Sequence, residues 1–175
     1  MHHGTAAILD SEYPFSALLR ASDRDVLLGQ IVESVWATTL ELPVSRRDDG
    51  EDLDHGPGDH RTVVGTVRVE GAWPMTVALV GSLTLAARCA ERMFAAQPGS
   101  LGSAELCDAW GELVNQVGGN LKALIQPPGR LGLPVVTEGD GYTWRAPGTR
   151  VINELTFASV GGRLRLTVAR PDPAP

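Results

Sequence analysis

The order of helical and strand-like segments is the feature that most limits what this chain can fold into. Residues 62–81 alternate apolar and polar side chains on either side of Glu70-Gly71-Ala72, which predicts a β-hairpin. Residues 151–160 and 163–170 show a second strand pair, joined by Gly161-Gly162, a turn signal typical of hairpins. Because parallel strands need a long crossover between them, strands that come in pairs favour antiparallel pairing.

Helical spacing of apolar residues marks three further segments. We expect helices near residues 22–42, 82–96 and 103–125, each followed by proline or glycine, and one more strand at 133–138. The order is helix, strands, helix, helix, strands. The sequence therefore predicts an α+β fold with three main helices and a mostly antiparallel sheet built from two strand groups.

The chain has 175 residues, which is enough for one domain with a substantial core. We place that domain at 21–170, after an N-terminal arm at 1–20. The stretch 46–61 is charged and contains glycine and proline, so we expect a mobile, solvated loop there. Residues 171–175 read as a disordered tail.

Composition excludes several classes of function. The formal net charge is −6 without a basic stripe, which argues against nucleic-acid binding. No apolar run is long enough to span a bilayer, and the first residues lack a secretory signal, so we expect a cytoplasmic protein. Cys89 and Cys107 both fall in helical patterns and are expected to be reduced core thiols.

The segment 103–125 carries the candidate functional residues. At about 100° per residue, one side of this helix is apolar and predicts the buried stripe: Leu106, Trp110, Leu113, Val117, Leu121 and Leu124. Asp108, Glu112, Asn115 and Gly119 share a narrow sector opposite that stripe. Periodicity alone leaves a merely solvated face as the usual interpretation of such a sector.

Three glycines interrupt this helix, although each costs about 0.5–1 kcal/mol relative to alanine. Gly111 and Gly118 are spaced so that a neighbouring helix could approach closely. Gly119 lies on the polar sector, where a missing side chain would leave space for a partner.

The same segment resembles the signature of the CheC/CheX/FliY family of chemotaxis phosphatases. That signature has Asp or Ser, three residues, Glu, two residues, Asn, and then Gly-Asn. Here those positions are Asp108, Glu112, Asn115 and Gly119-Asn120. More loosely, the order of elements from about residue 26 to 168 is also similar to that family.

Two departures from the family pattern refine the resemblance. Members with two sites repeat the signature on the first helix, whereas here Glu33 is followed three residues later by Trp36. The chain therefore resembles the single-site CheX type. Family members also carry a proline well downstream of the asparagine, and Pro134 is available at a shorter spacing.

The resemblance implies a phosphatase that hydrolyses the aspartyl phosphate of a response-regulator receiver domain. It implies that Asn115 orients the attacking water and that Glu112 docks on the receiver's active-site lysine. Asp108 would extend that contact and Gly119 would leave room for it. The receiver would supply Mg²⁺, so no cofactor of this chain's own is expected. A homodimer is also implied, and open strand edges favour one.

Other functions stay open on the residues alone. A non-catalytic docking or scaffold module could use the same fold, because fold does not fix activity. A sensor domain that binds a small ligand on the helix face is a third alternative. The pairs Asp54-His55 and Asp59-His60 could suggest a metal site, but we interpret them as parts of a solvated loop.

Overall fold

The computed structural model describes residues 21–48, 61–125, 127, 129–140 and 144–172. The predicted arm at 1–20, residues 49–60 with their Asp-His pairs, and residues 173–175 lie outside the described residues. The helical elements are α3 (Ala21–Val35), the π-helical turn η1 (Trp36–Leu40), α4 (Leu83–Met93) and α5 (Ser103–Ala123). The strands are β1 (Val44–Arg47), β2 (Arg61–Glu70), β3 (Met75–Ser82), β4 (Arg130–Leu131), β5 (Val135–Asp140), β6 (Thr149–Ser159) and β7 (Gly162–Pro171).

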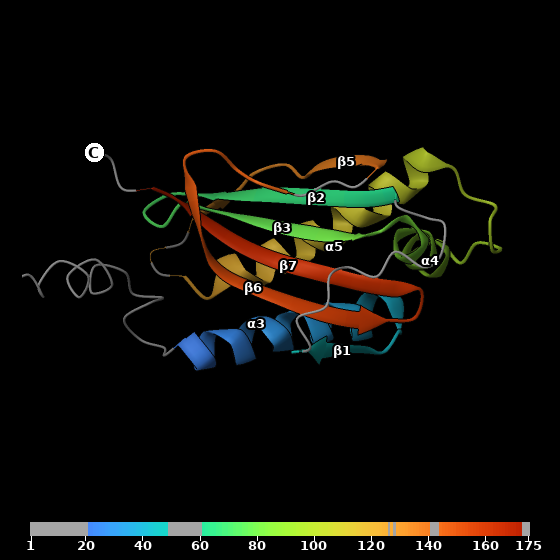
Figure 1. Cartoon of the computed structure of the whole chain (residues 1–175), viewed down its shortest axis with the longest axis horizontal. Helices are drawn as coiled ribbons and strands as arrows, with labels where there is room; N and C mark the ends of the chain where they lie inside the picture. The colour runs from blue at the N-terminus through green and yellow to red at the C-terminus, as the bar shows by residue number, and fades with distance from the viewer. Residues whose placement is uncertain (1–20, 49–60, 126, 128, 141–143, 173–175) are drawn as a thin grey trace, which may run out of the picture.

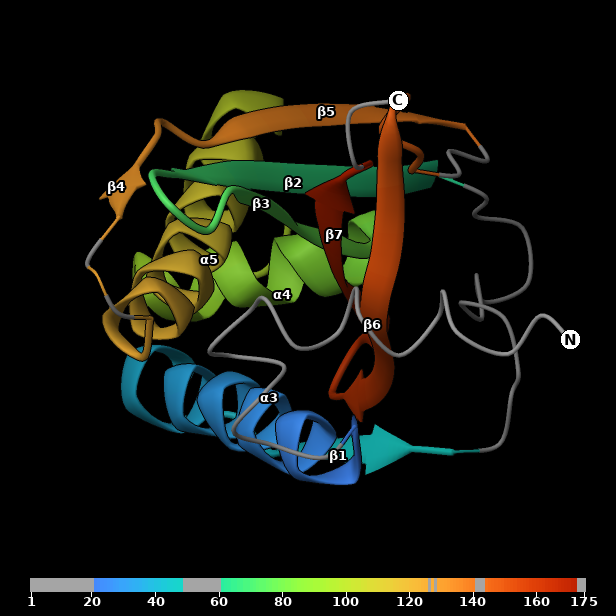
Figure 2. The same ribbon diagram turned by 90° about the vertical axis from the view of Figure 1, so that its left-hand side faces the viewer.

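The strands form one seven-stranded antiparallel sheet in the order β1-β6-β7-β3-β2, and β2 pairs on its outer side with both β4 and β5. Helices α3, α4 and α5 lie together on one face of this sheet (Figure 1). Figure 2 shows the strong twist, with β6 and β7 running across the direction of β2 and β5. The predicted α+β fold with three main helices is confirmed.

Both predicted hairpins are present. Strands β2 and β3 pair from Thr62 with Ser82 to Val69 with Met75, as the alternation indicated. In the second hairpin, Ser159 pairs with Gly162, so Gly162 belongs to β7 and the turn lies one residue earlier than predicted. Gly161 makes that turn with a φ of +107°, which side chains rarely adopt.

Trp110 of α5 fixes the helix to the sheet. Its ring lies over Gly65 of β2 and Gly81 of β3, where an added Cβ would come within 2.8 Å and 2.6 Å of ring atoms. Its indole N–H donates to the carbonyl of Leu79 at 3.2 Å. Trp36 meets the same ring edge to face, with centroids 6.5 Å apart. Both tryptophans are fully buried, which confirms the predicted place of Trp110 on the buried stripe of its helix.

Gly118 also brings α5 close to the sheet, which corrects one prediction. We expected Gly111 and Gly118 to admit a neighbouring helix. Instead, an added Cβ at Gly118 would collide with Val67 of β2, and one at Gly111 would come within 3.3 Å of Val136 of β5. The two glycines therefore bring the helix onto strands, because positions seven residues apart lie on the same side of a helix and this side faces β2 and β5.

The helix predicted near residues 22–42 begins as expected, but its C-terminal part is not α-helical. Val26 of α3 is 56% exposed, because it lies on the opposite side of the helix from the fully buried Leu28. At Trp36 the α-helix becomes a π-helical turn that ends at Leu40, and Glu41 follows in the left-handed region with φ of 52°.

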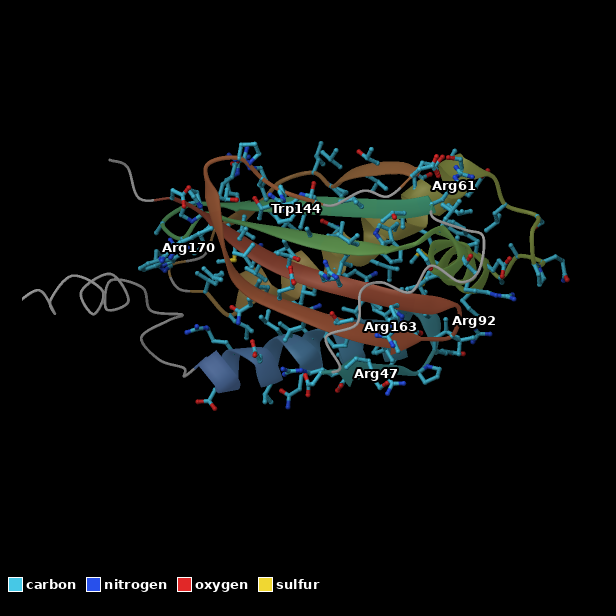
Figure 3. The ribbon with its side chains drawn as sticks, in the orientation of Figure 1. Arg47, Arg61, Arg92, Trp144, Arg163 and Arg170 are labelled. Carbon is cyan, nitrogen blue, oxygen red and sulfur yellow. The ribbon has the colours of Figure 1, made fainter. Side chains whose placement is uncertain are left out.

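Two predicted irregular stretches contain strand residues. The expected loop 46–61 begins inside β1, where Arg46 pairs with Phe157. This strand is an exposed sheet edge, and charged side chains suit such an edge although they suggest a loop in sequence. The expected tail 171–175 begins within β7, where Pro171 pairs with Thr149. Arg170, labelled at the end of the sheet in Figure 3, lies 5.7 Å from the centroid of the Trp73 ring.

Cys89 of α4 is fully buried and free, so the prediction of a reduced core thiol is confirmed for it. Burial raises its pKa to about 12. Cys107 is also free but only partly buried. The prediction that it is a core residue is therefore wrong. Within the described ranges, no helix is long and apolar enough to cross a membrane.

The contact of Gly118 with Val67 predicts a steric effect on stability. Gly118→Ala should lower the free energy of unfolding by about 1–3 kcal/mol, because the new methyl group overpacks the helix–sheet contact. Gly29→Ala is the matched control in α3, where an added Cβ meets nothing within 4 Å. It should raise stability by about 0.5–1 kcal/mol through helix propensity alone. Urea unfolding of both variants measures these free energies. A Gly118→Ala protein as stable as the wild type would contradict the close contact.

The burial of Cys89 predicts a loss of stability at alkaline pH. Its pKa is raised from 9.0 to about 12 in the folded protein, so between those values only the unfolded chain ionises this thiol. The Cys89 contribution to stability should therefore fall as pH rises from about 9 towards 12. The native protein at pH 8 should react with a thiol reagent at Cys107 only, and Cys89 should react after unfolding. Rapid native labelling of Cys89 would contradict its burial.

Candidate functional site

Helix α5 carries the four predicted site residues, and its start is fixed by local contacts. The N-cap is Gly102, whose N–H donates to the Glu105 carboxylate at 3.0 Å. The Ser103 hydroxyl donates to Glu138 Oε1 of β5 at 2.6 Å. Glu105 thus holds the first turn, and its charge also suits the positive end of the helix dipole.

The buried side of α5 is wider than the predicted stripe. Five of the six expected stripe residues are buried, and four more residues between them are buried as well: Ala109, Gly111, Val114 and Gly118. Leu124 is the exception at 47% exposed, because the helix ends at Ala123 and the next residue leaves the helical pattern. Core contacts on two sides therefore fix how the helix is rotated.

This rotation turns the predicted polar sector away from the core. Asp108 and Glu112 are exposed, while Asn115 and Gly119 are half-buried. Glu112 and Asn115 are neighbours one turn apart on the surface. Within the described residues, nothing forms a hydrogen bond with the Asn115 carboxamide, so its oxygen and nitrogen are available to water or a partner.

One side of Asn115 is bordered by the segment that joins β4 and β5. Asn115 lies midway between Gly111 and Gly119 on one line of the helix. An added Cβ at Gly111 would lie 3.8 Å from Pro134, and one at Gly119 would lie 3.8 Å from Leu131. This chain's own strand segment therefore covers part of the space beside Gly119. It also places Pro134 next to the site, despite the short spacing in sequence.

Two further residues reach the site, and the sequence analysis did not identify either of them. Gln116 Nε2 donates to Glu112 Oε1 at 2.9 Å. The Thr39 hydroxyl of η1 donates to Gln116 Oε1 at 2.6 Å. The i, i+4 spacing of Glu112 and Gln116 is a sequence signal for such a pair. Thr39 has no such signal, because it lies 77 residues away from Gln116 in the chain.

Among the described residues, this surface has neither an activated thiol nor a metal centre. The pKa of Cys107 is raised by its partial burial and by the negative charge of Glu138, which disfavours the reactive thiolate. The described residues contain no group of three His, Cys, Asp or Glu side chains that could hold a metal ion. A carboxylate and a free carboxamide can bind a cation and hold a water, but such a pair has no bond-breaking chemistry of its own.

Solved structures of several chemotaxis proteins are similar to this fold. The chemotaxis protein CheX from Vibrio vulnificus is 22% identical with a TM-score of 0.67, covering 86% of this chain and 97% of its own. CheX from Desulfovibrio desulfuricans is 16% identical with a TM-score of 0.63, at 81% and 94% coverage. A CheX–CheY–BeF₃–Mg²⁺ complex from Borrelia burgdorferi matches at 11% identity and a TM-score of 0.56, covering 83% of this chain and 96% of that chain.

A search of curated protein sequences found no match. A family model does match, and its description is "Chemotaxis phosphatase CheX". The match covers residues 63–157, more than half of the 175-residue chain, and includes the whole of α5 and its polar face. The chain therefore belongs to the CheX family of chemotaxis phosphatases.

Proposed function

We propose that this protein hydrolyses the aspartyl phosphate of a CheY-like receiver domain by laying the polar face of α5 against the receiver's active site. The observation that carries the proposal is the pair Glu112 and Asn115, held outward on one turn of a helix that the sheet fixes in place. The Borrelia burgdorferi complex supports it, because a protein of this fold is bound there to CheY, BeF₃ and Mg²⁺.

Asn115 is the residue we assign to the chemistry. A water oxygen attacks the phosphorus, the bond between phosphorus and the aspartyl oxygen breaks, and the products are inorganic phosphate and a free aspartate carboxylate. The acyl phosphate is already reactive, so positioning of the water and stabilisation of charge supply the acceleration. A neutral carboxamide can accept a hydrogen bond from water and hold it in line without repelling the anionic phosphate.

Glu112 is assigned to docking. Its negative charge would oppose attack on a dianionic phosphate, whereas the same charge forms a strong ion pair with a lysine in the receiver's active site. Asp108, one turn earlier and equally exposed, extends the acidic surface of the helix. Gly119, one turn after Asn115, adds no side chain to the helix surface at that point. Mg²⁺ belongs to the receiver in this proposal, so the chain supplies no metal ligand.

Removal of the Asn115 carboxamide tests the catalytic assignment. Asn115→Ala should reduce accelerated dephosphorylation by about 100-fold, or to the receiver's own rate, because the water is no longer positioned. Binding to the receiver should stay nearly unchanged. The measurement is the decay of acetyl-phosphate-loaded CheY-like receivers with Mg²⁺, together with titration of the same receivers loaded with BeF₃. Gln30→Ala, which removes an exposed carboxamide from α3, is the matched control.

Glu112→Ala should act in the opposite way, with weaker binding and a nearly unchanged rate at saturation. Its control is Glu33→Ala, which removes an exposed carboxylate from α3. Equal rates of receiver dephosphorylation for wild type and Asn115→Ala would contradict the proposed mechanism. Receiver binding without any acceleration by the wild type would leave the docking or scaffold function instead.

A further inference from the structure

The hydrogen bonds around Glu112 form a relay that starts on another helix. Thr39 of η1 donates to Gln116 Oε1 at 2.6 Å, and Gln116 Nε2 donates to Glu112 Oε1 at 2.9 Å. Neither Thr39 nor Gln116 lies on the signature positions, and both residues are half-buried whereas Glu112 is exposed.

Chemistry fixes the direction of this relay. An ionised carboxylate can only accept hydrogen bonds, so Gln116 must turn its NH₂ group towards Glu112. Its carbonyl oxygen then faces Thr39 and needs a donor, and a hydroxyl can donate. The orientation of the Gln116 amide therefore does not depend on an arbitrary choice between its oxygen and nitrogen. If Thr39 could not donate, the amide oxygen would lose its partner and Gln116 would be free to turn away.

Contacts with α4 and α5 hold the π-helical turn in place, and Thr39 with it. Trp36 at its start is buried against Trp110 of α5, and the N–H of Glu41 returns to the Trp36 carbonyl. At its other end, Arg92 of α4 donates to the Leu40 carbonyl at 3.0 Å and pairs with Glu41 at 3.2 Å. Arg92 is one of the residues labelled in Figure 3. A π-helical turn is less regular than an α-helix and is frequently found at functional sites.

We infer that Thr39 and Gln116 are positioning residues that hold the Glu112 carboxylate in the orientation in which it pairs with the receiver's active-site lysine. This inference rests on the proposed function. Gln116 occupies Oε1 of Glu112, and Oε2 has no hydrogen-bond partner among the described residues. One oxygen of this exposed carboxylate is thus bound to the fold, and the other is left for a partner. When docking removes water, the bond from Gln116 strengthens because it involves a charged acceptor in a less polar surrounding.

Preorganisation sets the size of the expected effect. A free glutamate side chain loses rotamer freedom on docking, and the relay reduces that loss because one oxygen is already held. Ordering one such side chain corresponds to about 2- to 12-fold in affinity. Thr39→Val keeps the shape of the side chain and removes only the donor. It should weaken receiver binding by about 2- to 5-fold, and Gln116→Ala by about 2- to 12-fold.

The experiment is a double-mutant cycle between Thr39 and Glu112. Affinity for a CheY-like receiver loaded with BeF₃ and Mg²⁺ is measured for wild type, Thr39→Val, Glu112→Ala and the double variant. If Thr39 acts through Glu112, Thr39→Val should have less than about 1.5-fold effect in the Glu112→Ala background. Thr39→Ser, which restores the hydroxyl, should bind as tightly as wild type. Thr38→Val is the matched control, because that neighbouring hydroxyl donates only to the Ser34 carbonyl at 2.8 Å.

Measured rates of dephosphorylation distinguish a positioning role of Thr39 from a general effect on protein stability. In the dephosphorylation assay, Thr39→Val should raise KM by the same factor and leave kcat within about 2-fold, because Asn115 still holds the water. An equal loss of affinity with and without Glu112 overturns the inference, as does a lower melting temperature with unchanged affinity. Either result leaves the proposed function intact if the wild type accelerates dephosphorylation. A wild type that binds no receiver overturns both.

Discussion

The seating of Trp110 on Gly65 and Gly81 is the contact on which the site depends. A helix that lies on a sheet can rotate about its own axis unless something large fixes its angle. Here an indole ring fills the space left by two glycines, and its N–H is bound to the Leu79 carbonyl. Gly118 against Val67 adds a second fixed point two turns later. With the rotation set, the side of α5 that carries Glu112 and Asn115 has to face outward.

The site therefore takes its precision from the sheet, although every signature residue is on one helix. Strand β2 lies at the centre of this support, because it contacts α5 through Gly65 and Val67 and pairs with β3, β4 and β5. The segment between β4 and β5 returns along α5 and brings Pro134 beside Gly111. The paired strands and α5 are therefore packed together as one unit.

Sequence periodicity was sufficient for the parts of this unit that follow from local geometry. Helical spacing placed Glu112 and Asn115 on the same outward turn. Alternation predicted the first hairpin, and the turn signal Gly161-Gly162 predicted the second. It failed where the environment decides. Arg46 and Arg47 suggested a loop but form an edge strand, since an exposed edge accepts charge. The neighbour of Gly118 was expected to be a helix and is Val67 of β2. The contact of Thr39 with Gln116 joins residues 77 apart, and no local pattern encodes it.

The exposure of Glu112 has a consequence for how such proteins can diverge. An exposed side chain contributes little to the folded core, so a mutation that removes it leaves a stable protein. A fold of this kind can lose or change its outward-facing residues one at a time, while selection on stability acts on residues such as Trp110. A substitution at Glu112 can therefore change the chemistry of this surface while the packing of the core is kept.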